Sequence, residues 1–166
     1  MRYALTPIDL HNDILASSGI RFANYLLDRI VDYLIGTTVL GLLTYFVDMA
    51  DETYYDQPYT MIIRNFLIGL VFTMAYYFIM ETTLGRTIGK FATSTVVVTD
   101  EGLKPTTRHI AIRTLCRLIP FDAFSFLGSG VGWHDTISNT RVVKISAYEF
   151  QVVQESELEE IGQNIE

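Results

Sequence analysis

The sequence predicts a mainly α-helical membrane protein built around a two-span transmembrane helical hairpin. Hydrophobic residues make up 49% of the 166 residues, and the mean hydropathy of +0.27 is high for a soluble chain of this length. Two long apolar segments follow one another with only a short linker between them. We further expect a cytoplasmic β-hairpin and an amphipathic or re-entrant interfacial helix.

The two predicted spans cover about residues 25–47 and 61–80. Their uncharged stretches, Tyr33–Val47 and Asn65–Met80, hold 15 and 16 residues. A helix needs roughly 20 residues to cross a bilayer, so each span must include a charged flanking turn. The alternative is a soluble protein with two buried helices, but a chain this small could hardly cover both.

The charge pattern predicts how the hairpin is oriented. The linker, residues 48–60, has four acids and no base, whereas residues 84–144 contain eight bases. Because basic loops stay in the cytoplasm, both chain ends should be cytoplasmic and the linker external. We therefore predict an N-terminal cytoplasmic segment over 1–18, a membrane domain over 19–144 and an acidic cytoplasmic tail over 145–166. The tail is poorly patterned, and we expect it to be mobile, with a short helix near 155–161.

Three charged residues share one face of the first predicted span. Arg21, Asp28 and Asp32 are spaced by seven and four, which places them within about 40° of one another on a helix. Carboxylates at membrane depth usually face a protein interior and often have a function. This stripe is either a set of structural ion pairs or a site that handles ions or protons. Arg21 should meet lipid headgroups or Asp28.

A small amount of β-structure is predicted after the second span. Gly85 and Gly89 indicate a turn or a close approach of two backbones. Residues 94–99 are β-branched, residues 100–102 form a turn signal, and Leu103 should begin the return strand. A closing strand is predicted over 141–145.

A basic amphipathic helix is predicted over about residues 107–119. His109, Arg113 and Arg117 recur every four residues, which is typical of a helix at the membrane interface with its bases toward headgroups or acids. Residues 121–132 are apolar and rich in glycine but too short to span, so we interpret them as a re-entrant or interfacial segment. Asp122 within them needs a partner.

The bases of this helix have acidic candidates in other parts of the chain. We expect Arg113 and Arg117 to fold back under the first span and neutralise Asp28, Asp32 or Asp122. Glu81 should end the second span at its cytoplasmic side.

Several functions are disfavoured by the sequence. His134 stands beside Asp135, but adjacent residues form no triad and no nucleophile elbow is visible, so we expect no enzyme. Cys116 is the only cysteine, and the histidines lack ligand spacing, so we expect no disulfide, metal or cofactor. A nucleic-acid partner is not expected, because no basic stripe is interleaved with aromatics.

Taken together, the motifs GIRFANYLLD, TLGRTIGK, VVVTDEG, IPFDAFSFLG and GWHDTISNTRVV resemble the RDD family of bacterial membrane proteins. The family is named for an arginine and two aspartates, to which Arg21, Asp28 and Asp135 correspond. The resemblance covers about residues 19–144. The IPF…SFL version, without a full third span, is similar to members from Bacteroidetes-like bacteria.

The resemblance implies a multi-pass protein of the bacterial cytoplasmic (inner) membrane, and transport or cation/proton antiport is proposed for some members. We weigh an accessory or assembly subunit of a larger membrane complex against a homo-oligomeric cation/proton transporter that uses Asp28 and Asp32. Binding of lipid or a small ligand at the basic helix is a third hypothesis. The expected partners are the bilayer and other membrane subunits or the chain itself. The candidate ion, proton or ion-pair residues are Asp32, Glu81, Arg113, Arg117, Asp122 and His134.

Overall fold

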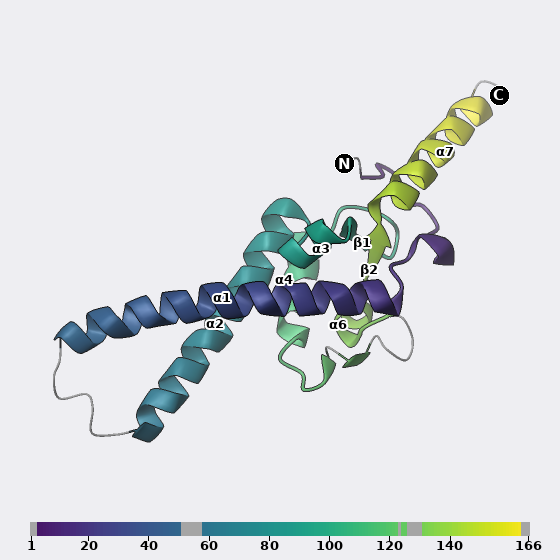
Figure 1. The fold of residues 1–166 in the computed structure, drawn as a ribbon. Coiled ribbons are helices and arrows are strands. Elements are labelled where there is room, and N and C mark those ends of the chain that lie inside the picture. The colour runs from purple at the N-terminus through teal and green to yellow at the C-terminus, as the bar shows by residue number, and fades with distance from the viewer. Residues whose placement is uncertain (1–2, 51–57, 123, 126–130, 164–166) are drawn as a thin grey trace.

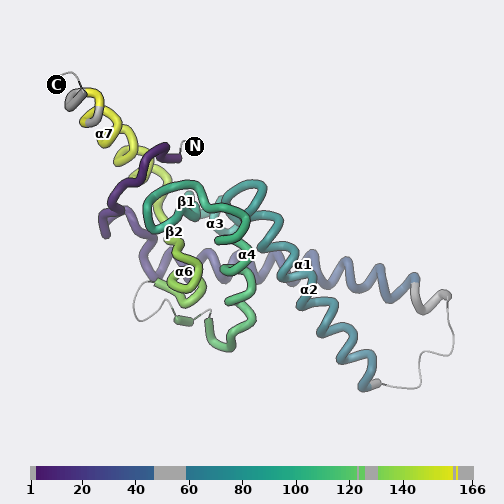
Figure 2. Tube along the Cα trace, turned by 180° about the vertical axis from the view of Figure 1, so that it is seen from behind, coloured from purple at the N-terminus to yellow at the C-terminus, as the bar shows by residue number. Residues whose placement is uncertain are grey.

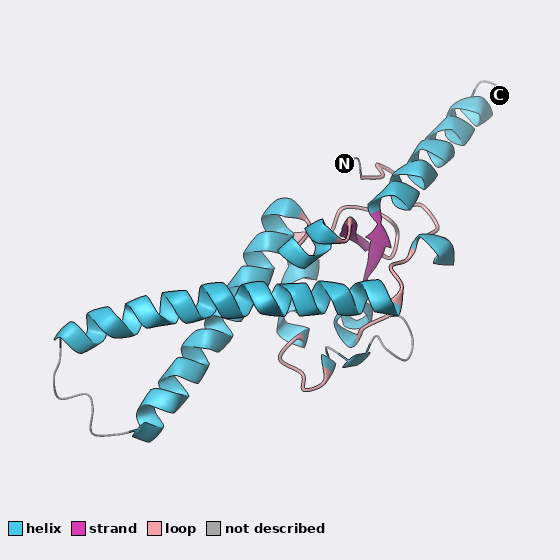
Figure 3. Ribbon diagram, viewed as in Figure 1, coloured by secondary structure: helices cyan, strands magenta, loops and turns pink. Residues whose placement is uncertain are grey.

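A computed structural model describes residues 3–50, 58–122, 124–125 and 131–163. Most of these residues are helical, and the strands form one small sheet (Figure 3). The elements in chain order are η1 (Asn12–Ile14), α1 (Ser18–Ala50), α2 (Pro58–Leu84), α3 (Ile88–Ala92), β1 (Thr95–Thr99), α4 (Thr107–Cys116), α6 (Trp133–Ile137), β2 (Thr140–Lys144) and α7 (Ile145–Gln163).

The long helices α1 and α2 cross and then diverge away from the rest of the molecule, as two opposite views show (Figures 1 and 2). Among the described residues, Tyr59–Leu84 in α2 is the one helix long and apolar enough to cross a membrane, and little of it is buried within the chain. The second predicted span lies inside it. The first lies in α1, whose N-terminal half is charged, so the two-span topology stays a prediction.

The predicted β-hairpin is wrong in its pairing. The turn forms as expected, with Gly102 at φ +73° and its N–H donating to the Thr99 carbonyl. However, β1 pairs antiparallel with β2, the predicted closing strand, and not with residues after Leu103. Pro105 lacks the N–H that a ladder needs, and α4 begins two residues later, so no return strand can grow.

The C-terminal tail is also more ordered than predicted. Helix α7 starts directly after β2, ten residues before the short helix that the sequence suggests. Its first turns carry Tyr148 and Gln151, which are buried, and the Gln151 side chain donates to the Asp9 carbonyl at 2.6 Å. Packing against the N-terminal segment therefore fixes a helix that its weak apolar pattern does not predict.

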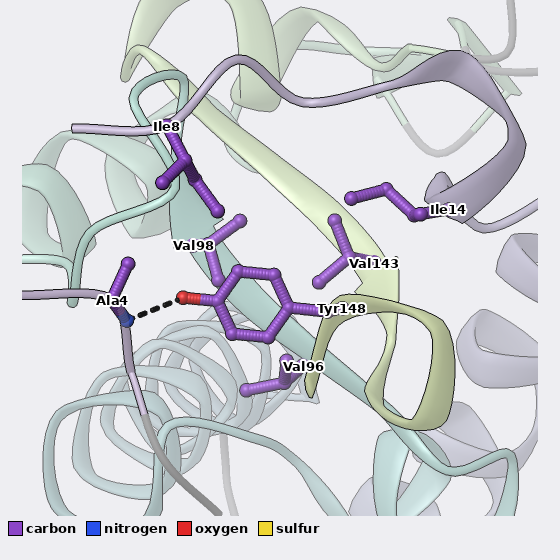
Figure 4. Close-up of a cluster of buried hydrophobic side chains, with 7 residues drawn as sticks. All are labelled: Ala4, Ile8, Ile14, Val96, Val98, Val143 and Tyr148. Atoms are coloured by element: carbon purple, nitrogen blue, oxygen red, sulfur yellow. Dashed lines mark hydrogen bonds between the residues drawn. The ribbon is translucent and has the colours of Figure 1, made fainter. Parts of the chain in front are cut away.

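A hydrophobic cluster joins both ends of the chain to the sheet (Figure 4). Its buried members are Ala4, Ile8, Ile14, Val96, Val98, Val143 and Tyr148. The N-terminal segment runs beside the sheet, with the Ile8 N–H bound to the Glu101 carbonyl and the Ala16 N–H bound to the Val142 carbonyl. Because Ala16 lies just before α1, the sheet holds the start of that helix in place.

We predict that Tyr148→Phe loosens this cluster. The Tyr148 hydroxyl accepts from the Ala4 N–H at 2.9 Å and donates to the Gly102 carbonyl. Removing it leaves two buried backbone groups unpaired, which costs about 1–3 kcal/mol. Hydrogen exchange of the β1 and β2 amides should accelerate correspondingly. The exposed Tyr45 offers the matched control, and equal exchange in Tyr45→Phe and Tyr148→Phe would contradict the assignment.

Candidate functional site

The first buried carboxylate, Asp28, fastens α3 to α1. It accepts hydrogen bonds from the Thr87 hydroxyl at 2.6 Å, the Gly89 N–H at 2.7 Å and the Tyr76 hydroxyl at 3.1 Å. A Cβ at Gly89 would collide with the Asn24 carbonyl oxygen and the Asp28 carboxylate, so only glycine fits. The predicted close approach of two backbones at Gly89 is thereby confirmed.

The second carboxylate, Asp135, lies in the first turn of α6 and is completely buried. It forms ion pairs with Arg21 of α1 and Arg113 of α4, and both guanidinium groups are almost fully buried. Its Oδ2 also accepts from the Gly132 N–H at 3.2 Å. Arg113 donates to the Thr140 hydroxyl at 2.9 Å, which connects the group to β2.

The third carboxylate, Glu81, lies near the end of α2 and gathers three cations. Lys90 Nζ is 2.7 Å from Oε1, Arg113 Nε is 3.1 Å from Oε2 and Arg117 Nη2 is 3.3 Å from Oε1. The Arg117 guanidinium also stacks over the Tyr77 ring, 3.8 Å from its centroid. Arg113 therefore bridges Glu81 and Asp135 and joins two carboxylates into one network.

The fourth carboxylate, Asp122, is paired with His134. Its oxygens accept from the His134 backbone N–H at 3.0 Å and contact Nδ1 at 2.7 Å. Burial lowers the pKa of His134 below its ordinary value, and Arg113 adds to this although Asp135 opposes it. His134 is therefore neutral at neutral pH and donates to Asp122 through Nδ1–H.

Electrostatics keep the core of this network ionised. Burial alone would raise the pKa of Asp135, but the guanidinium groups of Arg113 and Arg21 outweigh it and hold this pKa well below the usual range. Burial lowers the pKa of Lys90, and the adjacent Glu81 opposes that effect. Asp135 therefore stays ionised between Arg21 and Arg113 as a fixed set of ion pairs.

Asp32 stands apart from the network. It accepts from Thr73 of α2 at 2.9 Å and from Arg29 at 3.0 Å, and Arg29 is about half exposed. Asp32 lines a groove of about 580 Å³ that lies between α1 and α2 and is closed on a further side by residues 117–122 and 124; its walls also include Gly36 and Gly69.

Three expected pairings are corrected by the structure. Arg21 binds Asp135, not headgroups or Asp28. The bases Arg113 and Arg117 fold back as expected, but they bind Glu81 and Asp135 in place of Asp28, Asp32 or Asp122. Each choice follows from position, because α6 places Asp135 between α1 and α4, whereas α3 covers Asp28.

The partner of Asp122 also differs from the prediction. It is His134, and not Arg113 or Arg117. Within the predicted re-entrant or interfacial segment, residues 123 and 126–130 lie outside the described residues. Sequence reasoning missed Lys90 as a network member. The only signal was its place in the TLGRTIGK motif, one residue after the glycine that contacts α1.

Comparison with known families agrees with this architecture. The RDD family profile matches residues 15–139, which is most of the chain. The chain belongs to the RDD family. No curated protein and no solved structure matches it significantly. RDD membership and the apolar helix α2 together indicate a membrane protein.

The three residues that the sequence resemblance relates to the name of the family have two separate roles in this chain. The arginine and the second aspartate, Arg21 and Asp135, are partners in one buried ion pair. The first aspartate, Asp28, binds α3 through hydrogen bonds. The RDD residues thus hold α1 against α6 at one point and against α3 at another.

We predict that Asp135→Asn destabilises the end of the molecule that contains α6. It leaves the buried guanidinium group of Arg21 without a counter-charge and that of Arg113 with Glu81 alone, and breaking a buried pair typically costs about 3–5 kcal/mol. Trp133, the single tryptophan of the chain, lies in α6 and reports local unfolding by its fluorescence.

Asp100→Asn is the matched control, because Asp100 pairs with Arg141 at 3.0 Å on the surface. Such exposed pairs contribute about 0–1 kcal/mol. Equal losses of stability in the two variants would contradict a special role for the buried pair.

Proposed function

We propose that this RDD protein is an accessory or assembly subunit of a larger bacterial membrane complex, and that the groove between α1 and α2 receives a helix of the partner. The observation that carries the proposal is this groove. It is bounded by α1 and α2, which diverge in Figures 1 and 2, and by residues 117–122 and 124, and its volume is about 580 Å³.

The walls of the groove suit a transmembrane helix. Helices associate in membranes through small residues that allow close approach and through polar side chains that bond across the interface. Gly69 of α2 lines the groove, and a Cβ added there would meet nothing within 4 Å. Thr37 and Asn65 supply polar groups in the same walls. By contrast, Gly36 already packs against Phe72 within the chain.

The topology assumed here is the two-span hairpin with both ends in the cytoplasm of a bacterial cell. It is supported by the apolar α2, by the exposed apolar side chains in the distal half of α1 and by the basic residues after α2. The network around Glu81 and Asp135 then lies at the cytoplasmic end of the spans.

A homo-oligomeric cation/proton transporter is the alternative, and one observation bears on it. Asp28 already accepts three hydrogen bonds, which suits a structural role. Asp32 lines the groove and has an exposed partner in Arg29, so it is the carboxylate better placed to exchange a proton. Two helices cannot enclose a pore, so this function requires several copies.

We predict that Gly69→Trp releases the partner. A bulky ring in the groove blocks close approach, and such overpacking costs about 1–3 kcal/mol, or roughly tenfold or more in association. The measurement is a mild-detergent pull-down from native membranes with mass spectrometry and the mass of the intact particle. Val71→Trp is the matched control, because Val71 is exposed on the same helix away from the groove residues.

A stoichiometric partner that Gly69→Trp loses and Val71→Trp retains supports the subunit proposal. A particle that contains only copies of this chain contradicts it. Cation-driven proton flux in proteoliposomes, compared between the unmodified chain and Asp32→Asn, then tests the alternative.

We predict the topology from reporter fusions. A fluorescent protein at the C-terminus should fluoresce, because both ends are cytoplasmic, and alkaline phosphatase inserted within residues 51–57 should be active outside. Active phosphatase at the C-terminus would place that end outside the cytoplasm and refute the predicted orientation.

A further inference from the structure

A small cavity lies inside the charged network, where α1, α3, α4, α6 and β2 meet. Its volume is about 40 Å³, and its cationic lining side chains are Arg21, Lys90, Arg113 and Arg117. Among the described residues, no acidic side chain lines it. The carboxylates of Glu81 and Asp135 lie behind the cations, so the cavity faces a positive surface.

Within the part of the chain that the structure describes, three of these cations keep a buried nitrogen without a hydrogen bond, although in Arg113 this nitrogen, Nε, still lies 3.1 Å from Glu81 Oε2. Arg21 is 4% exposed, and its Nη2 is buried with no hydrogen-bond partner among the described residues. The Nε of Arg117 is in the same state. A buried donor that is left unpaired costs about 1–3 kcal/mol, and more when it is charged, so both atoms require an acceptor.

The charge balance favours an anion over a neutral acceptor. Four cations line the cavity, whereas two carboxylates, Glu81 and Asp135, bind them directly. Asp122 is paired with the neutral His134, and Asp28 is bonded to neutral donors. The four cationic side chains of the lining only donate, which suits an anion, whereas acceptors for the protons of a water molecule come from His134, Asn24 and Tyr25 alone.

We propose that this cavity binds a small inorganic anion, of the size of chloride or a compact oxyanion. A water molecule needs roughly 10–15 Å³ of such space, so about 40 Å³ admits only a few atoms. The same size excludes an intact lipid headgroup. The anion accepts from Arg21 and Arg117, neutralises excess positive charge and thereby braces α1 against α4. Tyr25 and Arg117 line both this cavity and the groove beside α1 and α2, so the two sites are neighbours.

The test uses the full chain in detergent with gluconate, an anion too bulky for the cavity, as the starting salt. Chloride, nitrate or phosphate then replaces gluconate at constant ionic strength. The expected result is a saturable rise in the unfolding temperature followed by Trp133 fluorescence. In parallel, the chain should broaden the ³⁵Cl NMR line, and a competing anion should reverse the broadening.

Arg117→Gln removes one lining charge while Lys90 and Arg113 still neutralise Glu81. It should weaken anion binding about tenfold or more. Arg141→Gln is the control, because Arg141 pairs with Asp100 outside the cavity. This variant should bind the anion as tightly as the unmodified chain does.

No chloride-dependent stabilisation and no excess line broadening in the unmodified chain would overturn the proposal, whether or not Arg117→Gln folds. Equal anion affinity in Arg117→Gln and Arg141→Gln would also overturn it. If vesicles of anionic lipid stabilise the chain and free anions do not, lipid headgroups supply the negative charge. That outcome would refute the proposal of a bound inorganic anion.

Discussion

The guanidinium group of Arg113 is the point on which the arrangement of the helices depends. It is 1% exposed and binds Asp135 of α6, Glu81 of α2 and the Thr140 hydroxyl of β2, although it belongs to α4. Through Asp135 it is also coupled to Arg21 of α1. Buried ion pairs are weak evidence for net stability, because desolvation offsets much of their attraction. Their value here is specificity, since any other packing of these helices would leave a buried charge alone.

The same constraint explains why α1 is not uniformly apolar. Its first turns must supply Arg21 to Asp135 and Asp28 to α3, and both contacts lie near the sheet. Polar positions are therefore concentrated in its N-terminal half, whereas its distal half exposes large apolar side chains such as Leu42 and Phe46. The two halves of α1 thus suit different environments, and among the described residues α2 alone is long and apolar enough by composition to cross a membrane.

The sequence patterns correctly predicted the features that depend on interactions between residues close together in the chain. The apolar α2, the β-branched strand, the turn at Gly102 and the contact made by Gly89 all follow from residue type and spacing. The partners of the buried charged residues could not be predicted from residue type and spacing. The pairing of Arg113 with Glu81 and Asp135, for example, depends on how elements far apart in sequence assemble. Helix α7 was missed for the same reason, as its burial comes from the N-terminal segment. The family resemblance identified Arg21 and Asp135, but not that they bind each other.

The closed network also limits where function can lie. Asp28, Glu81, Asp122 and Asp135 each have fixed partners, so these side chains have little freedom to move at that end of the molecule. Asp32, by contrast, pairs with a half-exposed arginine and borders the groove. A rigid, charged base that holds two diverging apolar helices at a set angle is suited to present that groove to another helix. The same rigidity would be a disadvantage in a carrier that must alternate between two states, because moving α1 against α6 would break buried ion pairs.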